Sequence, residues 1–268
     1  MEIIEKSFTC DKDGFKIRGM QYLPSDFEQN RKYPIVILSH GFLGNYTHMA
    51  DFGRDFASIG YVACSFSFCG SSLAGQSRQT ASDGKSTDMT ITTQVQDLAA
   101  VKNFILQQTY ADAERLVLLG VSQGGFVSGL AAAADPDMVK KLIMIFPALC
   151  IPDDARRGRL AGSSYDPNHV PDVIDCGQTL LGKAFHEDVA DRDPYQELAA
   201  YKGPVLILHG REDELVADTY SIQAQKRYEK GQCCLHLIAD MGHGYNEMQR
   251  QKLFAYIRQF LSDGEEIR

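Results

Sequence analysis

The sequence has no run of 18 apolar residues, no cluster of basic residues and no C-x-x-C pair. Without a long apolar run, no membrane-spanning helix is expected. The formal charge is −8, and an acidic chain without a basic patch is a poor match for nucleic acid. The N-terminal residues also lack a basic segment followed by an apolar one, so no signal peptide is expected. The 44% of hydrophobic and 23% of charged residues exclude a disordered tail, a collagen-like chain and a coiled coil.

The cysteines and histidines also lack the patterns that bind metal. Seven cysteines form an odd set without the spacing of a zinc site, and the seven histidines include no H-E-x-x-H motif. Isolated cysteines of this kind are typical of reduced thiols in the cytoplasm. We therefore expect a cytoplasmic protein that holds no metal and requires no cofactor.

Short apolar runs alternate with longer segments of helical periodicity, which predicts an α/β fold. The runs are Ile3–Thr9, Phe15–Leu23, Ile35–Ser39, Tyr61–Phe66, Leu116–Leu119, Leu142–Phe146, Val205–Leu208 and Leu235–Ile238. The middle runs are apolar at consecutive positions, as in parallel strands that are covered by helices on both faces. The turn signal Asp13-Gly14 separates the first two runs and predicts an antiparallel hairpin.

One long segment interrupts this alternation. From Ala148 to Lys202 the chain is rich in Asp, Arg, Gly and Pro and has no strong strand pattern. Connections between a strand and a helix are usually about 2–6 residues long, so this segment is an insertion. We predict that residues 1–147 and 204–268 form an α/β core, a mostly parallel sheet with helices on both faces, and that residues 148–203 form an inserted cap.

The strongest local motif is Gly120-Val121-Ser122-Gln123-Gly124, which directly follows a predicted strand and begins a predicted helix. A serine on such a sharp turn stands clear of the sheet, and the small residues two positions away let the backbone pass itself. The helix N-terminus favours negative charge developing nearby. The motif predicts that Ser122 is a catalytic nucleophile, with an incidental serine in a glycine-rich turn as the alternative.

A serine nucleophile needs a base, and the base needs an acid that orients it. In this type of fold the acid and then the histidine follow the serine along the chain. Asp213 lies in the loop after the run Val205–Leu208, and His243 lies between two glycines after the last run. We therefore predict a triad of Ser122, Asp213 and His243.

Other acids and histidines compete for these roles. Glu212 and Glu214 flank the predicted acid, but Asp213 has the better spacing from Gly210. His40 and His209 end predicted strands and are expected to be structural. No catalytic role is assigned to the remaining histidines of the chain either.

Ester cleavage also needs two backbone N–H groups that bind the oxyanion. One is expected from Gln123, the residue after the nucleophile. The other is expected from the loop Ser39-His40-Gly41-Phe42, where Gly41 permits close backbone approach and Phe42 supplies the N–H. An ordinary turn at His40-Gly41 is the alternative reading of that loop.

These motifs resemble the α/β-hydrolase superfamily, and more narrowly the bacterial cinnamoyl or feruloyl esterases. The resemblance covers nearly the whole chain. It includes, besides the motifs above, the elements Phe66-Ser67-Phe68, Asp88-Met89-Thr90, the cap segment Tyr165-Asp166-Pro167-Asn168-His169-Val170-Pro171, and Leu181-Gly182. In that family the cap offers polar groups to the phenol of a hydroxycinnamate. The resemblance implies Asp154, Tyr165 and His186 as such substrate-binding residues, with His186 standing where the family has a tyrosine.

The sequence thus predicts a serine esterase that hydrolyses a small ester, such as a hydroxycinnamate ester, through an acyl-enzyme. Other serine hydrolases remain open alternatives, namely a thioesterase, an acylglycerol lipase or a small peptidase. A non-catalytic protein that binds small molecules on the same fold is the alternative from another class. The oligomeric state also stays open, with a homodimer among the expectations.

Overall fold

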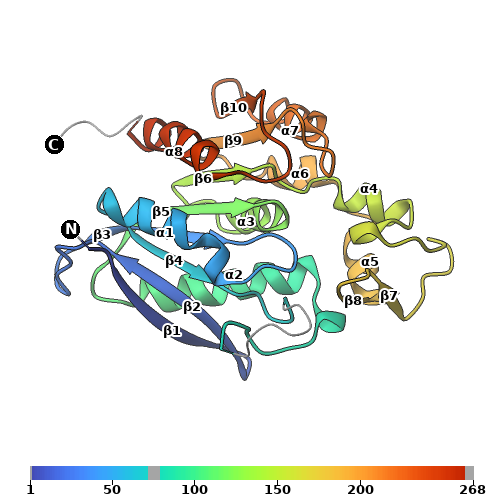
Figure 1. Ribbon diagram of the computed structural model, residues 1–268, viewed down its shortest axis with the longest axis horizontal. Coiled ribbons are helices and arrows are strands. Elements are labelled where there is room, and N and C mark those ends of the chain that lie inside the picture. Colours follow the sequence, from blue (N-terminus) through green and yellow to red (C-terminus); the bar gives the residue numbers. More distant parts are fainter. Residues whose placement is uncertain (1, 72–78, 263–268) are drawn as a thin grey trace.

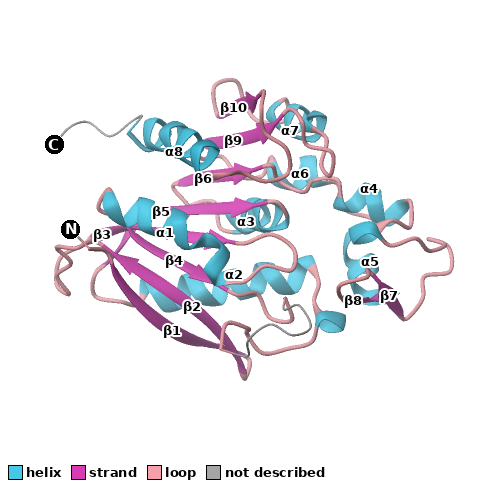
Figure 2. Cartoon of the chain, viewed as in Figure 1, coloured by secondary structure: helices cyan, strands magenta, loops and turns pink. Residues whose placement is uncertain are grey.

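An eight-stranded, mostly parallel sheet runs through the computed structural model of the protein (Figures 1 and 2). The structure describes residues 2–71 and 79–262, so residues 1, 72–78 and 263–268 of the predicted core range lie outside it. The strands are β1 (Ile4–Lys12), β2 (Phe15–Leu23), β3 (Tyr33–Ser39), β4 (Val62–Phe66), β5 (Ala111–Val121), β6 (Lys141–Ile145), β9 (Val205–Gly210) and β10 (Cys233–Ile238). Each of the eight runs predicted from the sequence falls on one of them.

The order of the strands is β1-β2-β4-β3-β5-β6-β9-β10. β1 pairs with β2 and β2 with β4 in antiparallel fashion, and all other neighbours are parallel. The hairpin predicted at Asp13-Gly14 is therefore correct, and both of these residues have positive φ. The α/β-hydrolase fold predicted from the sequence is confirmed.

Helices cover both faces of the sheet, and this explains the uninterrupted apolar runs. On one face lie α1 (Ala50–Ser58) and α8 (Glu247–Ser262), and on the other α2 (Ile91–Leu106) and α3 (Gln123–Ala134) with the shorter α7 (Asp218–Gln225). In β3, Ile35 and Ile37 pack on the α2–α3 side, while Val36 and Leu38 pack on the α1–α8 side. Since successive side chains of a strand point to opposite faces, a strand buried on both must be apolar throughout.

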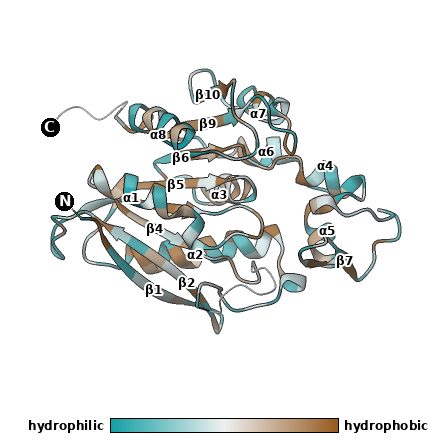
Figure 3. Cartoon of the chain, in the orientation of Figure 1, coloured by the Kyte–Doolittle hydropathy of each residue, from teal (hydrophilic) through white to brown (hydrophobic). Residues whose placement is uncertain are grey.

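The amphipathic helices follow the expected period. In α2 the side chains of Leu98, Val101 and Ile105 are fully buried, and in α8 those of Leu253 and Ile257 are. Figure 3 shows α8 with hydrophobic and hydrophilic stretches side by side, as expected for a helix with one face on the core. No helix in the described part of the chain is long and apolar enough to cross a membrane.

Of the segment predicted as a cap, residues 148–203, the part up to about residue 189 lies beyond the carboxyl ends of the parallel strands (Figure 1). Its last part returns to the core, where Leu198 packs against Gly129 of α3 and the Tyr201 hydroxyl donates to Val139 O at 3.0 Å. The segment contains α4 (Ile151–Arg156), the 3-10 turn η3 (Leu160–Gly162), β7 (Val173–Asp175), β8 (Leu180–Gly182), α5 (Lys183–Val189) and α6 (Pro194–Leu198). The β7–β8 hairpin was not expected from the sequence. Its strands have three residues each, which is too short for an alternating pattern.

A polar network fastens this segment to the first turn of α2. The Asp188 carboxylate accepts hydrogen bonds from the backbone N–H of Thr92 at 2.9 Å and from its hydroxyl at 2.5 Å. The Arg192 guanidinium is 3.1 Å from Asp188 and 2.6 Å from Glu197. Asp188 is only 15% exposed, so water replaces little of this bonding.

We expect Asp188→Ala to lower the free energy of unfolding by about 2 kcal/mol, because it leaves the Thr92 N–H and the Arg192 guanidinium short of an acceptor. Urea unfolding followed by circular dichroism measures the change. The matched control is Asp191→Ala, which removes an exposed acid nearby and should change the stability by less than about 0.5 kcal/mol. Equal effects of the two substitutions would contradict the anchoring role.

Candidate active site

Ser122 occupies a strained turn between β5 and α3. Its φ is +55°, a region that residues other than glycine rarely adopt. The two glycines of the motif make this turn possible. A Cβ on Gly120 would lie 2.0 Å from the carbonyl oxygen of Gly124, and one on Gly124 would lie 2.4 Å from those of Ser39 and His40. Any larger residue at either position would force the backbone to move.

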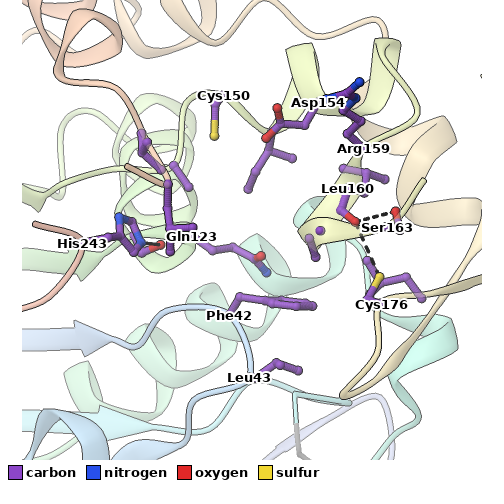
Figure 4. A pocket seen from close by; sticks show the side chains of 18 of the residues that line it. Phe42, Leu43, Gln123, Cys150, Asp154, Arg159, Leu160, Ser163, Cys176 and His243 are labelled. Atoms are coloured by element: carbon purple, nitrogen blue, oxygen red, sulfur yellow. Dashed lines mark hydrogen bonds between the residues drawn. The ribbon is translucent and has the colours of Figure 1, made fainter. Parts of the chain in front are cut away.

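The three residues predicted as a triad are brought together by the fold. Ser122 Oγ is 2.8 Å from His243 Nε2, and His243 Nδ1 is 2.7 Å from Asp213 Oδ2. They come from three loops at the carboxyl ends of β5, β9 and β10, which is where sites of open α/β sheets gather. Of the three, only His243 is labelled in the close-up of the neighbouring cavity (Figure 4). The Asp213 carboxylate accepts the Nδ1–H of His243, so Nε2 is free to accept the serine proton. This is the arrangement that activates a serine hydroxyl for attack.

Asp213 is held as a carboxylate by several donors. Its Oδ1 accepts the backbone N–H groups of Leu215 at 3.0 Å and of Val216 at 2.8 Å. Burial of the side chain by itself would raise the pKa of Asp213, but hydrogen bonds from His209, His243 and Val216 outweigh it and hold that pKa well below its usual range. Its neighbours Glu212 and Glu214 are exposed, so the fold selects Asp213 among the three acids.

His40 has a structural place in the loop beside the nucleophile. The backbone N–H of Phe68 donates to His40 Nε2 at 3.2 Å, so Nδ1 carries the proton and donates to Gly41 O at 2.7 Å. Complete burial lowers the pKa of His40 to about 4, so the ring is uncharged at neutral pH. The neutral imidazole therefore fixes the turn at Gly41.

Two backbone N–H groups, those of Phe42 and Gln123, lie beside the nucleophile. They make no hydrogen bond within the part of the chain that the structure describes. The loop of Phe42 is close to the serine, since a Cβ on Gly41 would lie 3.3 Å from Ser122 Cβ. A pair of free donors at this place can bind the oxygen of a tetrahedral intermediate.

A buried glutamine that the sequence analysis missed supports Gln123. The side-chain amide of Gln123 donates to Gln94 Oε1 at 2.7 Å, and Gln94 Nε2 lies 3.2 Å from the sulfur of Met89. Gln94 is 1% exposed and shares the buried face of α2 with Leu98 and Val101. Its position on the buried helical period of α2, which it shares with Asp97 among apolar residues, is the signal that could have identified it.

A cavity of about 850 Å³ lies between the sheet edge and the cap. Figure 4 shows His243, Gln123 and Phe42 on the core side and Leu160 with Asp154 on the cap side. The wall is mostly apolar, and its apolar members are Phe42, Leu43, Ala148, Ile151, Leu160, Ala161, Leu181, Phe185, Leu215 and Val216. A site of this size and lining suits a small, largely apolar molecule. No set of three metal-binding side chains is grouped within residues 2–71 and 79–262.

Only one of the three cap residues predicted to bind substrate lies on this cavity. Asp154 lines it, and burial raises the pKa of that carboxyl group. Tyr165 and His186 are not among the residues that line it: the Tyr165 hydroxyl is 2.8 Å from His186 Nδ1, and His186 is buried on α5. Tyr165 and His186 thus bond to each other beside the cavity, and their role in substrate binding stays a prediction from the resemblance.

Comparison with known proteins gives a family and several relatives. A model of the prolyl oligopeptidase family matches residues 53–264. A probable dipeptidyl-aminopeptidase B of Phaeosphaeria nodorum is 28% identical over 47% of this chain, and the acylamino-acid-releasing enzyme of Mus musculus is 24% identical over 72% of it. These matches span only 14% and 26% of the relatives' own lengths.

Among solved structures, Est1E from Butyrivibrio proteoclasticus with ferulic acid bound is 27% identical, with a TM-score of 0.82. The likeness covers 95% of this chain and 99% of that one. The match therefore includes the cap segment as well as the sheet and the loops around Ser122.

Substitution of Gly124 tests the backbone contact that creates the turn. We expect Gly124→Ala to lower the free energy of unfolding by about 2–3 kcal/mol, because its methyl group would collide with two backbone oxygens of the neighbouring loop. Gly244→Ala is the control, since Gly244 has open space around it and no positive φ, and it should cost less than about 1 kcal/mol. Thermal unfolding of both variants measures the two losses. Equal losses would contradict the conclusion that the close backbone contact at Gly124 is required for the turn.

Proposed function

The chain belongs to the prolyl oligopeptidase family, and on that premise we propose that it is a serine hydrolase that cleaves carboxylic esters of hydroxycinnamates or similar small acids. The observation that carries the proposal is the chain of hydrogen bonds from Ser122 through His243 to Asp213. The strained turn at Ser122 and the two free N–H groups beside it add further support.

In this proposal Ser122 Oγ attacks the ester carbonyl while His243 Nε2 takes its proton. Asp213 holds the imidazole in the required tautomer and stabilises the imidazolium that forms. The N–H groups of Phe42 and Gln123 bind the negative oxygen, a contribution of about 3 kcal/mol for each donor. His243 then passes the proton to the leaving alcohol, which departs and leaves an acyl-enzyme.

The second half of the reaction uses the same groups. A water molecule gives a proton to His243 and attacks the acyl carbon, and the oxyanion is bound again by the same two N–H groups. When this intermediate collapses, the Ser122 oxygen leaves and recovers its proton from His243. Every proton is thus carried by the chain's own side chains.

The substrate class rests on the cavity and on Est1E. Est1E binds ferulic acid, and this chain is similar to it over both core and cap. The apolar wall suits an aromatic ring, and Asp154 offers a carboxyl group on the cap side. A phenolic hydroxyl reaching Asp154 would donate a hydrogen bond to it, and a methoxy group would not.

A peptidase is the second candidate, and the relatives named as a dipeptidyl-aminopeptidase and an acylamino-acid-releasing enzyme favour it. The same serine chemistry cleaves amides and esters, so the geometry around Ser122 suits both. A comparison of methyl ferulate and p-nitrophenyl acetate with dipeptide and acetyl-alanine p-nitroanilides separates them. Faster turnover of the anilides would overturn the proposal that the protein is an esterase, but it would still agree with a serine hydrolase.

Ser122→Ala should lower kcat on p-nitrophenyl acetate by roughly 10⁴-fold or more, because no other group in the site replaces the hydroxyl. The same variant should no longer be labelled by a fluorophosphonate probe. Ser58→Ala, at an exposed serine on α1, is the control and should behave as the wild-type protein. Full activity in Ser122→Ala would exclude the proposed mechanism.

Asp154→Asn should lower kcat/KM only for esters whose acid carries a phenolic hydroxyl. We expect kcat/KM for methyl ferulate and methyl p-coumarate to fall about tenfold, since the charged acceptor for the phenol is lost. The value for methyl cinnamate, which has no phenol, should change less than about twofold. An equal loss on both kinds of ester would show that Asp154 does not bind the phenol.

A further inference from the structure

A second imidazole lies against Asp213, although its sequence position indicated only a structural histidine. His209 is the fifth residue of β9, and its side chain is completely buried. Its Nε2 is 2.9 Å from the carbonyl oxygen of Val216 and 3.3 Å from Asp213 Oδ2. Oδ2 is the oxygen that also accepts the hydrogen bond from His243. Two imidazoles therefore converge on one carboxylate oxygen.

The hydrogen-bond partners assign the protons of His209. A carbonyl oxygen can only accept, so Nε2 must carry a proton directed to Val216. The other nitrogen, Nδ1, is 2.7 Å from the hydroxyl of Ser221, which is itself fully buried on α7. Both ring nitrogens are therefore held, Nε2 by the carbonyl oxygen of Val216 and Nδ1 by the hydroxyl of Ser221.

The His209 ring contacts both the first and the last residue of the turn from Asp213 to Val216. Val216 donates its backbone N–H to Asp213 Oδ1 at 2.8 Å, and its carbonyl accepts from His209. The His209 ring thus holds Val216, whose N–H in turn holds Asp213 Oδ1. The ring also contacts Asp213 Oδ2 directly. Without His209 the carbonyl of Val216 and one side of the carboxylate would be buried next to an empty space.

We propose that His209, locked by Ser221, is a positioning residue that orients the Asp213 carboxylate toward His243. This inference rests on the function proposed above. His209 touches no substrate and takes no proton in the reaction.

The geometry of glutamine and asparagine gives a sharp test. In His209→Gln the side-chain amide nitrogen can reach the place of Nε2 and donate to Val216, whereas in His209→Asn the amide is too short. We expect His209→Asn to lower kcat on p-nitrophenyl acetate by about 10- to 100-fold, less than the roughly 10⁴-fold cost of altering a triad aspartate itself. KM should stay within about twofold, and His209→Gln should recover most of the lost kcat.

A second variant covers the case in which His209→Asn does not fold. Ser221→Ala removes only one hydroxyl from α7, frees the imidazole to rotate, and should lower kcat severalfold at unchanged KM. Thr219→Ala, at an exposed threonine on the same helix, is the matched control and should retain wild-type kcat. Circular dichroism and the thermal midpoint confirm that each variant compared is folded.

The possible outcomes separate the two proposals. If the folded wild-type protein hydrolyses no ester or anilide, the proposed function fails. If the wild type is active, the positioning role is overturned when Ser221→Ala, or folded His209→Asn, retains wild-type kcat. It is also overturned if His209→Gln is as impaired as His209→Asn, because the bulk of the ring and not its Nε2–H would then be the cause.

Discussion

Contact between backbones at the end of β5 determines where everything around Ser122 lies. Gly124 packs on the carbonyl groups of Ser39 and His40, so the loop that carries Phe42 must pass directly beside the serine. The Ser122 carbonyl also accepts a hydrogen bond from Ala148 N–H at 3.0 Å, at the first residue of the inserted segment. The turn at Ser122, with its two glycines, thus fixes the positions of the nucleophile, of the loop that carries Phe42 and of the start of the cap together.

The acid and the base are joined by a similar contact on neighbouring parallel strands. A Cβ on Gly210, at the end of β9, would lie 2.0 Å from the carbonyl oxygen of Met241. That same oxygen accepts the backbone N–H of Glu212 at 3.0 Å, which ties the loop of Asp213 to the loop of His243. Glycine is needed here because the two loops approach more closely than any side chain allows. The His243–Asp213 distance therefore follows from main-chain packing and does not depend on two flexible side chains finding each other.

The features that could be predicted from sequence are those with a local cause. A strand that is buried on both faces has an uninterrupted apolar run, so the sheet could be predicted from the sequence. A strained turn requires glycines at fixed positions, so the location of Ser122 could be predicted as well. The contact of His209 with Asp213 and the pairing of Tyr165 with His186 depend on which segments meet in space. No spacing rule describes such meetings. The β7–β8 hairpin was not predicted for another reason: a strand of three residues is too short to show an alternation of apolar and polar residues.

The cap and the core contribute different properties to the cavity, and the contacts explain how they can vary separately. Leu160, Leu181 and Phe185 form the cap wall and are almost fully buried, so its shape is fixed by packing within the cap. The hydrogen-bonded chain from Ser122 to Asp213 belongs entirely to loops of the sheet. Among the hydrogen bonds that join the two parts are those of the main chain at Ala148, of Asp188 with Thr92 and of Tyr220 with Asp153. A substitution in the cap wall therefore changes the fit of the bound molecule and leaves the serine, histidine and aspartate in place.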